Sequence, residues 1–203
     1  MHNLAILSYM KSLSLTTPHM IIMVGLPGSG KSFFAEKFAS TFGAPYVSTD
    51  IISSLGALEP QLIETISMYL LSELLKTKQS IIVECPAATR AERLELTKKA
   101  RANGYEPLIV WVQTDAATTK TRATRDKNKR GGVISDEQYE RTLTRFTAPN
   151  SLERPVVISG KHTYASQAKV VLQKLSAPRA ELSTQQIAPI RKTQQGRRNI
   201  TIR

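Results

Sequence analysis

The feature that most constrains this chain is the stretch Gly25-Leu-Pro-Gly-Ser-Gly-Lys-Ser32, which follows a short apolar run and precedes a helical pattern. It fits G-x-x-x-x-G-K-[ST], a pattern whose glycines let backbone N–H groups turn inward around an anion. The next helix directs the positive end of its dipole at the same place. In such a loop the lysine reaches the β- and γ-phosphates and the serine hydroxyl binds Mg²⁺. The sequence therefore predicts a phosphate-binding loop made of Gly25, Leu26, Pro27, Gly28, Ser29, Gly30, Lys31 and Ser32.

Five short apolar runs recur along the chain with helical patterns between them, at 20–24, 45–47, 80–83, 108–112 and 156–158. The runs do not alternate apolar with polar residues, which indicates strands that are covered on both faces. Among the helical patterns, one ends at Asn103-Gly104 and another begins with a capping box from Ser135 to Gln138. Strands that alternate with helices favour right-handed crossovers and a parallel sheet, so we predict an α/β fold.

The ends of the chain differ in composition from its middle. Residues 1–19 carry only a weak apolar cluster, and 176–203 are rich in Gln, Thr, Pro and Arg without aromatic residues. We therefore expect an N-terminal extension over 1–19, one domain over 20–175 and a flexible basic tail over 176–203. Met20 could itself be the natural start, because the first predicted strand begins there.

The net charge of +12 is concentrated in two segments: residues 120–130 and the tail each hold six basic residues and one acidic residue. Either segment can meet the phosphates of a partner or can be a solvated basic surface. No apolar run approaches the about 20 residues that cross a bilayer, so we expect no membrane partner. The one cysteine, Cys85, excludes an intramolecular disulfide framework. A cytoplasmic location is the simplest expectation.

From about Met20 to Leu175 the chain resembles small P-loop ATP-binding kinases of the AAA-type ATPase and kinase group, which include polynucleotide 5′-hydroxyl kinases and zeta-toxin-like proteins. The resemblance rests on GLPGSGKS. It is supported by YVSTD at the end of the second strand, PAATRAER after the third, TRATRDKNKR after the fourth and SDEQYERTLTRFTAP before the fifth. It implies ATP and Mg²⁺ as cofactors and a three-layer P-loop NTPase fold, with a five-stranded parallel sheet in the order 2-3-1-4-5. It also implies that adenine lies near the Gly160-Lys161 loop.

Asp50 ends the second predicted strand, and the carboxyl ends of parallel strands line the ligand crevice of such sheets. A carboxylate there can accept the proton of an attacking hydroxyl, and in the kinases that this chain resembles the matching aspartate is the general base. A helix N-cap is the alternative role. The family often places an arginine three residues later to grip an acceptor phosphate. Ser53 stands there in this chain, which weighs against a polynucleotide acceptor.

Glu84 ends the third strand at the Walker B position, where an acidic side chain orients Mg²⁺ through water, although the resembling kinases usually have aspartate. We therefore predict Ser32 and Glu84 as the metal-binding residues. Cys85 is expected to be a small buried residue and not a nucleophile. Arg90 and Arg93 open the next helix and could face the acceptor, while a solvated helix face explains Arg93 equally well.

The segment from Lys120 to Gly132 is predicted to be a helix end that runs into a mobile basic loop. Phosphoryl transfer spreads negative charge over oxygens, and an arginine that closes over them offsets this charge. Arg122 and Arg125 are spaced i, i+3 and can point the same way, and the resembling kinases carry lid arginines here. We predict Lys31, Asp50, Arg122 and Arg125 as catalytic residues. A nucleic-acid contact or a solvated run is the alternative for this segment.

These observations predict an ATP-dependent phosphotransferase that acts on an acceptor hydroxyl. The favoured acceptor is a nucleotide or a 5′-hydroxyl polynucleotide, with DNA or RNA binding through the basic lid and tail. A small-metabolite kinase is the close alternative. An ATP-binding regulator with slow hydrolysis, docked on nucleic acid by its tail, is a hypothesis of another class, and a nucleotide-sugar kinase is a third.

The chain has no N-K-x-D after the loop and no L-S-G-G-Q, which argues against a GTPase and a transporter ATPase. The lack of an acidic pair at the Walker B strand argues against a ring-forming motor.

Overall fold

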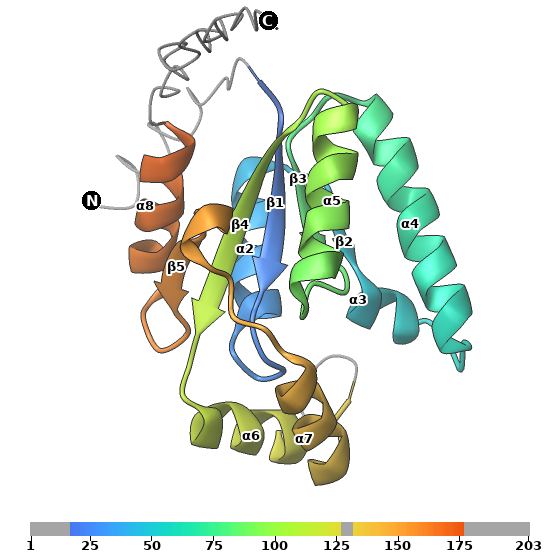
Figure 1. The fold of residues 1–203 in the computed structure, drawn as a ribbon, viewed down its shortest axis with the longest axis vertical. Coiled ribbons are helices and arrows are strands. Elements are labelled where there is room, and N and C mark those ends of the chain that lie inside the picture. The colour runs from blue at the N-terminus through green and yellow to red at the C-terminus, as the bar shows by residue number, and fades with distance from the viewer. Residues whose placement is uncertain (1–16, 127–131, 177–203) are drawn as a thin grey trace, which may run out of the picture.

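The structure, a computed structural model, describes residues 17–126 and 132–176 (Figure 1). The strands are β1 (His19–Val24), β2 (Tyr46–Ser48), β3 (Ile81–Glu84), β4 (Glu106–Gln113) and β5 (Val156–Ser159). The helices are α2 (Lys31–Phe42), α3 (Thr49–Ser53), α4 (Pro60–Lys76), α5 (Arg90–Ala102), α6 (Ala116–Arg125), α7 (Asp136–Arg145), the 3₁₀ turn η1 (Ser151–Glu153) and α8 (Tyr164–Leu175). Most of the expected N-terminal extension, the loop at 127–131 and the expected tail lie outside the described residues.

The five strands form one parallel sheet in the order β2-β3-β1-β4-β5, so the predicted α/β P-loop NTPase fold and its strand order are confirmed. β1 lies at the centre and pairs with both β3 and β4; Ile21 stands opposite Ile82 on one side and Leu108 on the other. Every β1 residue from Met20 to Val24 is buried, as expected for a strand covered on both faces. Because all strands run the same way, their carboxyl ends meet at one edge of the sheet.

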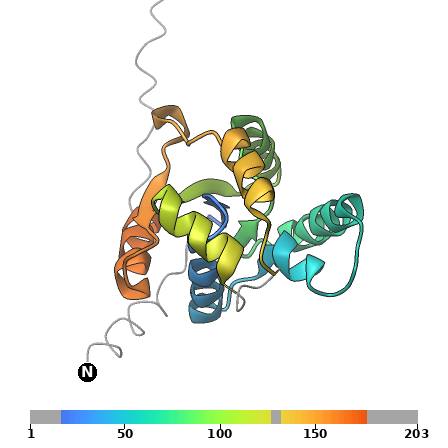
Figure 2. The same cartoon turned by 90° about the horizontal axis from the view of Figure 1, so that it is seen from below.

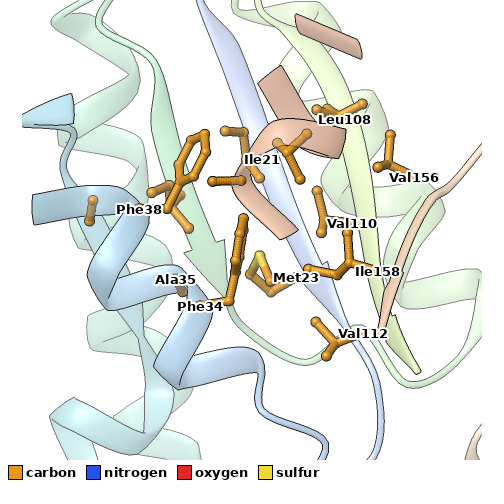
Figure 3. Close-up of a cluster of buried hydrophobic side chains, with 14 of the residues drawn as sticks. Ile21, Met23, Phe34, Ala35, Phe38, Leu108, Val110, Val112, Val156 and Ile158 are labelled. Carbon is orange, nitrogen blue, oxygen red and sulfur yellow. The ribbon is translucent and has the colours of Figure 1, made fainter. Parts of the chain in front are cut away.

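Helices cover both faces of the sheet (Figures 1 and 2). On one face, α2 and α8 pack against β1, β4 and β5, and Figure 3 shows Phe34 and Phe38 of α2 reaching over the strand residues of this cluster. On the other face, α4 and α5 bring Leu71 and Leu96 against the opposite sides of the same strands. Burying each such side chain contributes about 1.5–3 kcal/mol, which favours this three-layer packing.

Local signals fix several helix ends where the sequence predicts them. The Ser135 hydroxyl caps α7 in a capping box with Gln138, as predicted. α5 ends at Ala102, one residue before the predicted stop, and Gly104 adopts a φ of 76° there. Among the helices that the structure describes, none combines the length and the apolar character needed to cross a membrane.

Helices α6 and α7 lie beyond the carboxyl ends of the strands, apart from the two helical layers (Figures 1 and 2). A hydrogen bond of 2.6 Å joins the Thr119 hydroxyl to the buried Tyr139 hydroxyl, and Lys120 forms a 2.7 Å ion pair with Glu140. The two helices therefore form one packed unit, called the α6–α7 lid below. It stands over the edge of the sheet where open parallel sheets bind their ligands.

Candidate functional site

The predicted phosphate-binding loop connects the end of β1 at Val24 to the start of α2 at Lys31. It is closed by a turn in which the Ser29 N–H donates to the Leu26 carbonyl at 3.1 Å. Gly30 is the N-cap of α2, and the first turn of α2 contains no acidic residue. Nothing in this turn therefore opposes the positive end of the helix dipole, and the loop can receive an anion.

Two glycines let other backbone segments touch this loop. A Cβ on Gly28, whose φ is +80°, would lie 2.3 Å from the Thr119 carbonyl oxygen of α6. A Cβ on Gly160, in the loop after β5, would lie 1.9 Å from the Ser29 carbonyl oxygen. The Thr114 hydroxyl also donates to that oxygen at 3.0 Å. The lid and the β5–α8 loop are therefore both packed directly on the phosphate-binding loop.

Glu84, the predicted metal-binding residue of β3, is joined to the loop through its carboxylate. The Ser32 hydroxyl donates to Glu84 Oε1 at 2.9 Å, and Lys31 Nζ lies 3.9 Å from the same oxygen. The Tyr46 hydroxyl of β2 donates to the other oxygen, Oε2. Lys31 Nζ also donates to the Leu26 carbonyl at 3.1 Å. The structure thus brings Lys31, Ser32 and Glu84 together at the carboxyl edge of the sheet.

The electrostatics of this cluster follow from burial. Glu84 is 6% exposed, and burial raises the pKa of its carboxyl above the usual value, although the Lys31 charge acts in the opposite direction. Burial, and after it the Glu84 charge, raises the pKa of the Tyr46 phenol, which therefore stays protonated and serves as a donor. A carboxylate held in so dry a place favours a nearby cation strongly.

Asp50 is the second residue of α3 and is half-buried. Its alternative role as a helix N-cap is wrong, because the N-cap of α3 is Ser48, whose hydroxyl accepts from the Ile51 N–H at 3.4 Å. Asp50 thus lies beyond the end of β2 at Ser48, not at the strand end as predicted, and its charge contributes to the raised pKa of Glu84. Ser53, three residues after Asp50, donates its hydroxyl to the Asp50 carbonyl at 2.9 Å.

The two predicted lid arginines lie on the exposed side of α6. Arg122 Nη1 donates to the Gly160 carbonyl at 3.4 Å, which places its guanidinium on the β5–α8 loop. Arg125 is the last residue of α6. The structure thus sets Arg122 beside the loop where the family resemblance places adenine, while Arg125 stands at the lid's far end, next to residues outside the described part.

A cavity of about 800 Å³ opens at the carboxyl ends of β4 and β5. Leu26 of the phosphate-binding loop lies in its wall, together with Asp115 and Lys161, which form an ion pair of 2.6 Å. The bond from Lys161 holds the pKa of the Asp115 carboxyl well below its usual range. A cavity of this size can hold a nucleoside, and it adjoins the loop that receives the phosphates.

The fold and this cluster agree with a family comparison: residues 20–149 match the model AAA_33, described as an AAA domain. The chain belongs to this family. No curated protein sequence is significantly similar to the AAA domain of this chain or to its flanking segments.

Solved structures resemble this AAA domain in fold. A gluconokinase from Sinorhizobium meliloti 1021 is 20% identical with a TM-score of 0.56, covering 78% of this chain and 91% of its own. Kti12 from Chaetomium thermophilum, solved with ADP-AlF₃, is 15% identical with a TM-score of 0.62, covering 78% and 100%. A chain of the Pnkp1/Rnl/Hen1 RNA repair complex is 20% identical with a TM-score of 0.55, covering 66% and 46%. At these identities the likeness shows the fold alone.

The P-loop of an AAA domain implies a bound nucleotide, and the residues present also fit Mg²⁺. Ser32 and Glu84 offer oxygen donors, the ligand type that Mg²⁺ prefers. Within residues 17–126 and 132–176, no three His, Cys, Asp or Glu side chains gather into a metal site of their own. Mg²⁺ usually keeps several waters and takes only one or two protein ligands beside the substrate phosphates.

The two predictions for Arg93 of this AAA domain, a solvated helix face or a contact with the acceptor, are wrong. Arg93 is 0% exposed; it donates to both Glu153 carboxylate oxygens, at 2.6 and 3.0 Å, and to the Thr147 carbonyl at 2.9 Å. Its spacing carried a usable signal, since it lies on the same face of α5 as the buried Leu96 and Ala100. Arg90 is exposed at the start of that helix.

Cys85 is a small buried residue, as predicted, and burial raises the pKa of its thiol to about 12. Trp111 is half-buried: it packs against the core cluster on the α4 and α5 side of the sheet and borders the cavity. Tyr46 was missed altogether. Nothing in the sequence around it indicates that its hydroxyl meets Glu84, since the two residues lie on different strands.

Proposed function

We propose that this AAA domain is an ATP-dependent kinase that transfers the γ-phosphoryl group of ATP to an acceptor hydroxyl. The observation that carries the proposal is a pair of acidic side chains at the carboxyl edge of the sheet, one at the end of β3 and one on α3 after β2. Glu84 ends β3 and meets the phosphate-binding loop through Ser32, while Asp50 lies on α3, directly after β2, where its charge contributes to the raised pKa of Glu84. Of two carboxylates so placed, one can bind the metal and the other can accept the proton of the acceptor hydroxyl.

The residues of the loop would bind and orient the nucleotide. Backbone N–H groups of 25–30 and the start of α2 would hold the phosphates, and Lys31 would place its charge on the β- and γ-phosphates. Ser32 and Glu84 would hold Mg²⁺, which when bound neutralises charge on the transferring group. Asp50 would accept the acceptor's hydroxyl proton while the new O–P bond forms and ADP leaves.

The α6–α7 lid would supply the remaining positive charge. α6 is already packed on the loop at Gly28, and Arg122 donates to the carbonyl of Gly160, which lies between the cavity-lining residues Ser159 and Lys161. A guanidinium at this place can offset charge on the phosphates or cover the base. Arg125 lies three residues on, one turn along the same helix, and can approach the same charge. Closure of the lid would also exclude water from the transferring group.

A nucleotide or a 5′-hydroxyl polynucleotide is the first candidate for the acceptor, supported by the basic residues of 120–130 and 176–203. A small uncharged metabolite is the second candidate, and a specific observation favours it. Between Lys37 and Lys76 the chain has no basic residue, although it has Asp50, Glu59, Glu64 and Glu73. An acceptor bound beside α3 and α4 would therefore meet negative charge, which disfavours phosphate groups.

The test is transfer of label from γ-labelled ATP with Mg²⁺ to three sets of acceptors: 5′-hydroxyl DNA and RNA oligonucleotides, nucleosides and nucleotides, and sugars and polyols. Lys31→Ala should abolish transfer. Lys37→Ala is the matched control, because Lys37 lies on the same helix but contacts the exposed Phe33 ring at 4.5 Å. Nucleotide binding without transfer to any acceptor would overturn the kinase proposal in favour of a non-catalytic nucleotide-binding regulator.

A further inference from the structure

We propose that Tyr46 is a positioning residue, which orients the Glu84 carboxylate toward the Mg²⁺-bound nucleotide. The inference rests on the proposed nucleotide and metal binding and assigns a residue to it that no motif contains. Tyr46 is the first residue of β2, the edge strand beside β3.

The register of the two strands explains how the side chains meet. Ser48 stands opposite Glu84, and Tyr46 stands opposite Ile82, so Tyr46 and Glu84 project from the same face of the sheet. On that face the phenol reaches diagonally across two residues to Glu84 Oε2. The Tyr46 ring packs against the apolar cluster under α2. The ring is thus fixed by packing, independently of its hydroxyl.

Each oxygen of the Glu84 carboxylate then has its own donor. Oε1 receives the Ser32 hydroxyl at 2.9 Å, and Oε2 receives the Tyr46 hydroxyl. The Ser32 oxygen keeps lone pairs for a metal while its hydrogen is held by Glu84. This arrangement needs the carboxylate to stay in one orientation, with Oε1 toward the loop.

Tyr46 has a physical reason to be required in this chain. Glutamate has one more rotatable bond than the aspartate usual at this position, so a single contact from Ser32 leaves the carboxylate free to turn. Lys31, at 3.9 Å, supplies charge but is too distant to fix orientation. The Tyr46 hydroxyl removes the remaining freedom. Partners that orient a metal-binding carboxylate in this way typically change metal affinity by about 10- to 100-fold when removed.

The experiment compares Tyr46→Phe with the unaltered full-length chain by titration calorimetry with ADP, once in Mg²⁺ and once in EDTA. We expect ADP affinity in Mg²⁺ to fall about 10-fold and affinity in EDTA to stay unchanged. Tyr164→Phe is the matched control. Its hydroxyl forms a 2.8 Å hydrogen bond with Thr41 at the other end of α2, and its ring packs on the same cluster. It should change neither affinity.

A double-mutant cycle with Glu84→Gln separates positioning from a general effect. If Tyr46 acts through Glu84, adding Tyr46→Phe to Glu84→Gln should change the Mg²⁺-dependent affinity less than about twofold. Additive effects would overturn the inference, as would an equal loss in Mg²⁺ and EDTA or no loss in Mg²⁺. If the unaltered chain binds no nucleotide at all, the proposed function fails first, and this inference with it.

Discussion

At the residue scale, Gly28 has a role that the loop motif does not reveal. The motif explains glycine there through the backbone turn around phosphate, and the φ of +80° agrees with this. The structure adds a second reason, because the backbone of α6 occupies the space that a Cβ would need. The lid and the phosphate-binding loop are therefore in contact through a glycine, and a change at this residue acts on both.

Gly28→Ala should lower the free energy of unfolding by about 1–3 kcal/mol through crowding and also reduce nucleotide affinity, because α6 must shift away from the loop. Gly43→Ala is the control. Gly43 also has a positive φ, of 60°, but no atom lies within 4 Å of its added Cβ. It should cost about 1 kcal/mol of stability from backbone strain and leave nucleotide affinity intact. Denaturant unfolding and ADP titration give both quantities; equal losses of affinity in the two variants would contradict contact between loop and lid.

At the scale of elements, Arg93 of α5 joins the helical layer to the segment that returns from the lid. Its guanidinium reaches Ala87 and Ala88 before the helix and Thr147 and Glu153 after α7. The Thr147 N–H also donates to the Ala88 carbonyl at 2.9 Å. The exit of the α6–α7 lid is therefore fixed to the sheet domain at one buried charge. The sequence shows this arginine as part of a polar helix, but the packing makes it internal.

Glu153→Ala should lower the free energy of unfolding by about 3 kcal/mol, because it leaves the fully buried Arg93 charge without its partner. Glu137→Ala is the control, since its ion pair with Arg141 is 75% and 76% exposed and contributes at most about 0.5 kcal/mol. Urea unfolding of both variants measures the difference. Similar losses would show that the Arg93 pair is no more important than a surface pair.

The Arg93 bond also predicts a pH dependence. The hydrogen bonds from Arg93 hold the pKa of the Glu153 carboxyl below its ordinary value of 4.5. Because this pKa is lower in the folded state, the bond from Arg93 to Glu153 stabilises the fold fully above the ordinary carboxyl pKa. The stabilisation is lost as the pH falls through the folded-state pKa. Stability measured between pH 6 and pH 3 should therefore decrease more steeply for the unaltered chain than for Glu153→Gln. Parallel curves would contradict this assignment.

At the scale of the whole molecule, charge is divided between regions. The stretch between Lys37 and Lys76, which includes α3 and most of α4, is acidic, whereas 120–130 and 176–203 carry most of the net +12. A polyanion would therefore be attracted to the basic segments and repelled by the acidic stretch. The basic residues of 176–203 would then raise affinity for nucleic acid without contributing to phosphoryl transfer, which Arg122 and Arg125 of α6 would assist.

Removal of residues 177–203 should leave turnover unchanged and weaken binding to DNA or RNA, with a smaller dependence on salt, because six basic residues are lost. Transfer of label from ATP measures turnover, and binding of DNA or RNA at several salt concentrations measures affinity and its salt dependence. Both are measured on one preparation. A truncated chain that has lost catalysis would show that these residues do more than attract nucleic acid.

The sequence predicts those site residues whose positions depend on their near neighbours in the chain, and it misses those placed by distant elements. Lys31, Ser32 and the glycines of the loop are contiguous, and a contiguous loop after a strand has a geometry that its own residues largely set. Glu84 follows from its place at the end of a strand, whereas Asp50, predicted to end β2, lies on the helix that follows it. Arg93 was misjudged and Tyr46 was missed, because their surroundings come from elements distant in the chain.

The sequence by itself determined the α/β class and the phosphate-binding loop, because apolar strands and glycine spacing act over a few neighbouring residues. The tertiary structure alone decided which atoms meet the loop: Thr119 of α6 at Gly28, the Tyr46 hydroxyl at Glu84, and Arg122 at Gly160. Each of these contacts joins residues that are at least 38 positions apart in the chain. Such contacts depend on strand register and crossover packing, which no local pattern specifies.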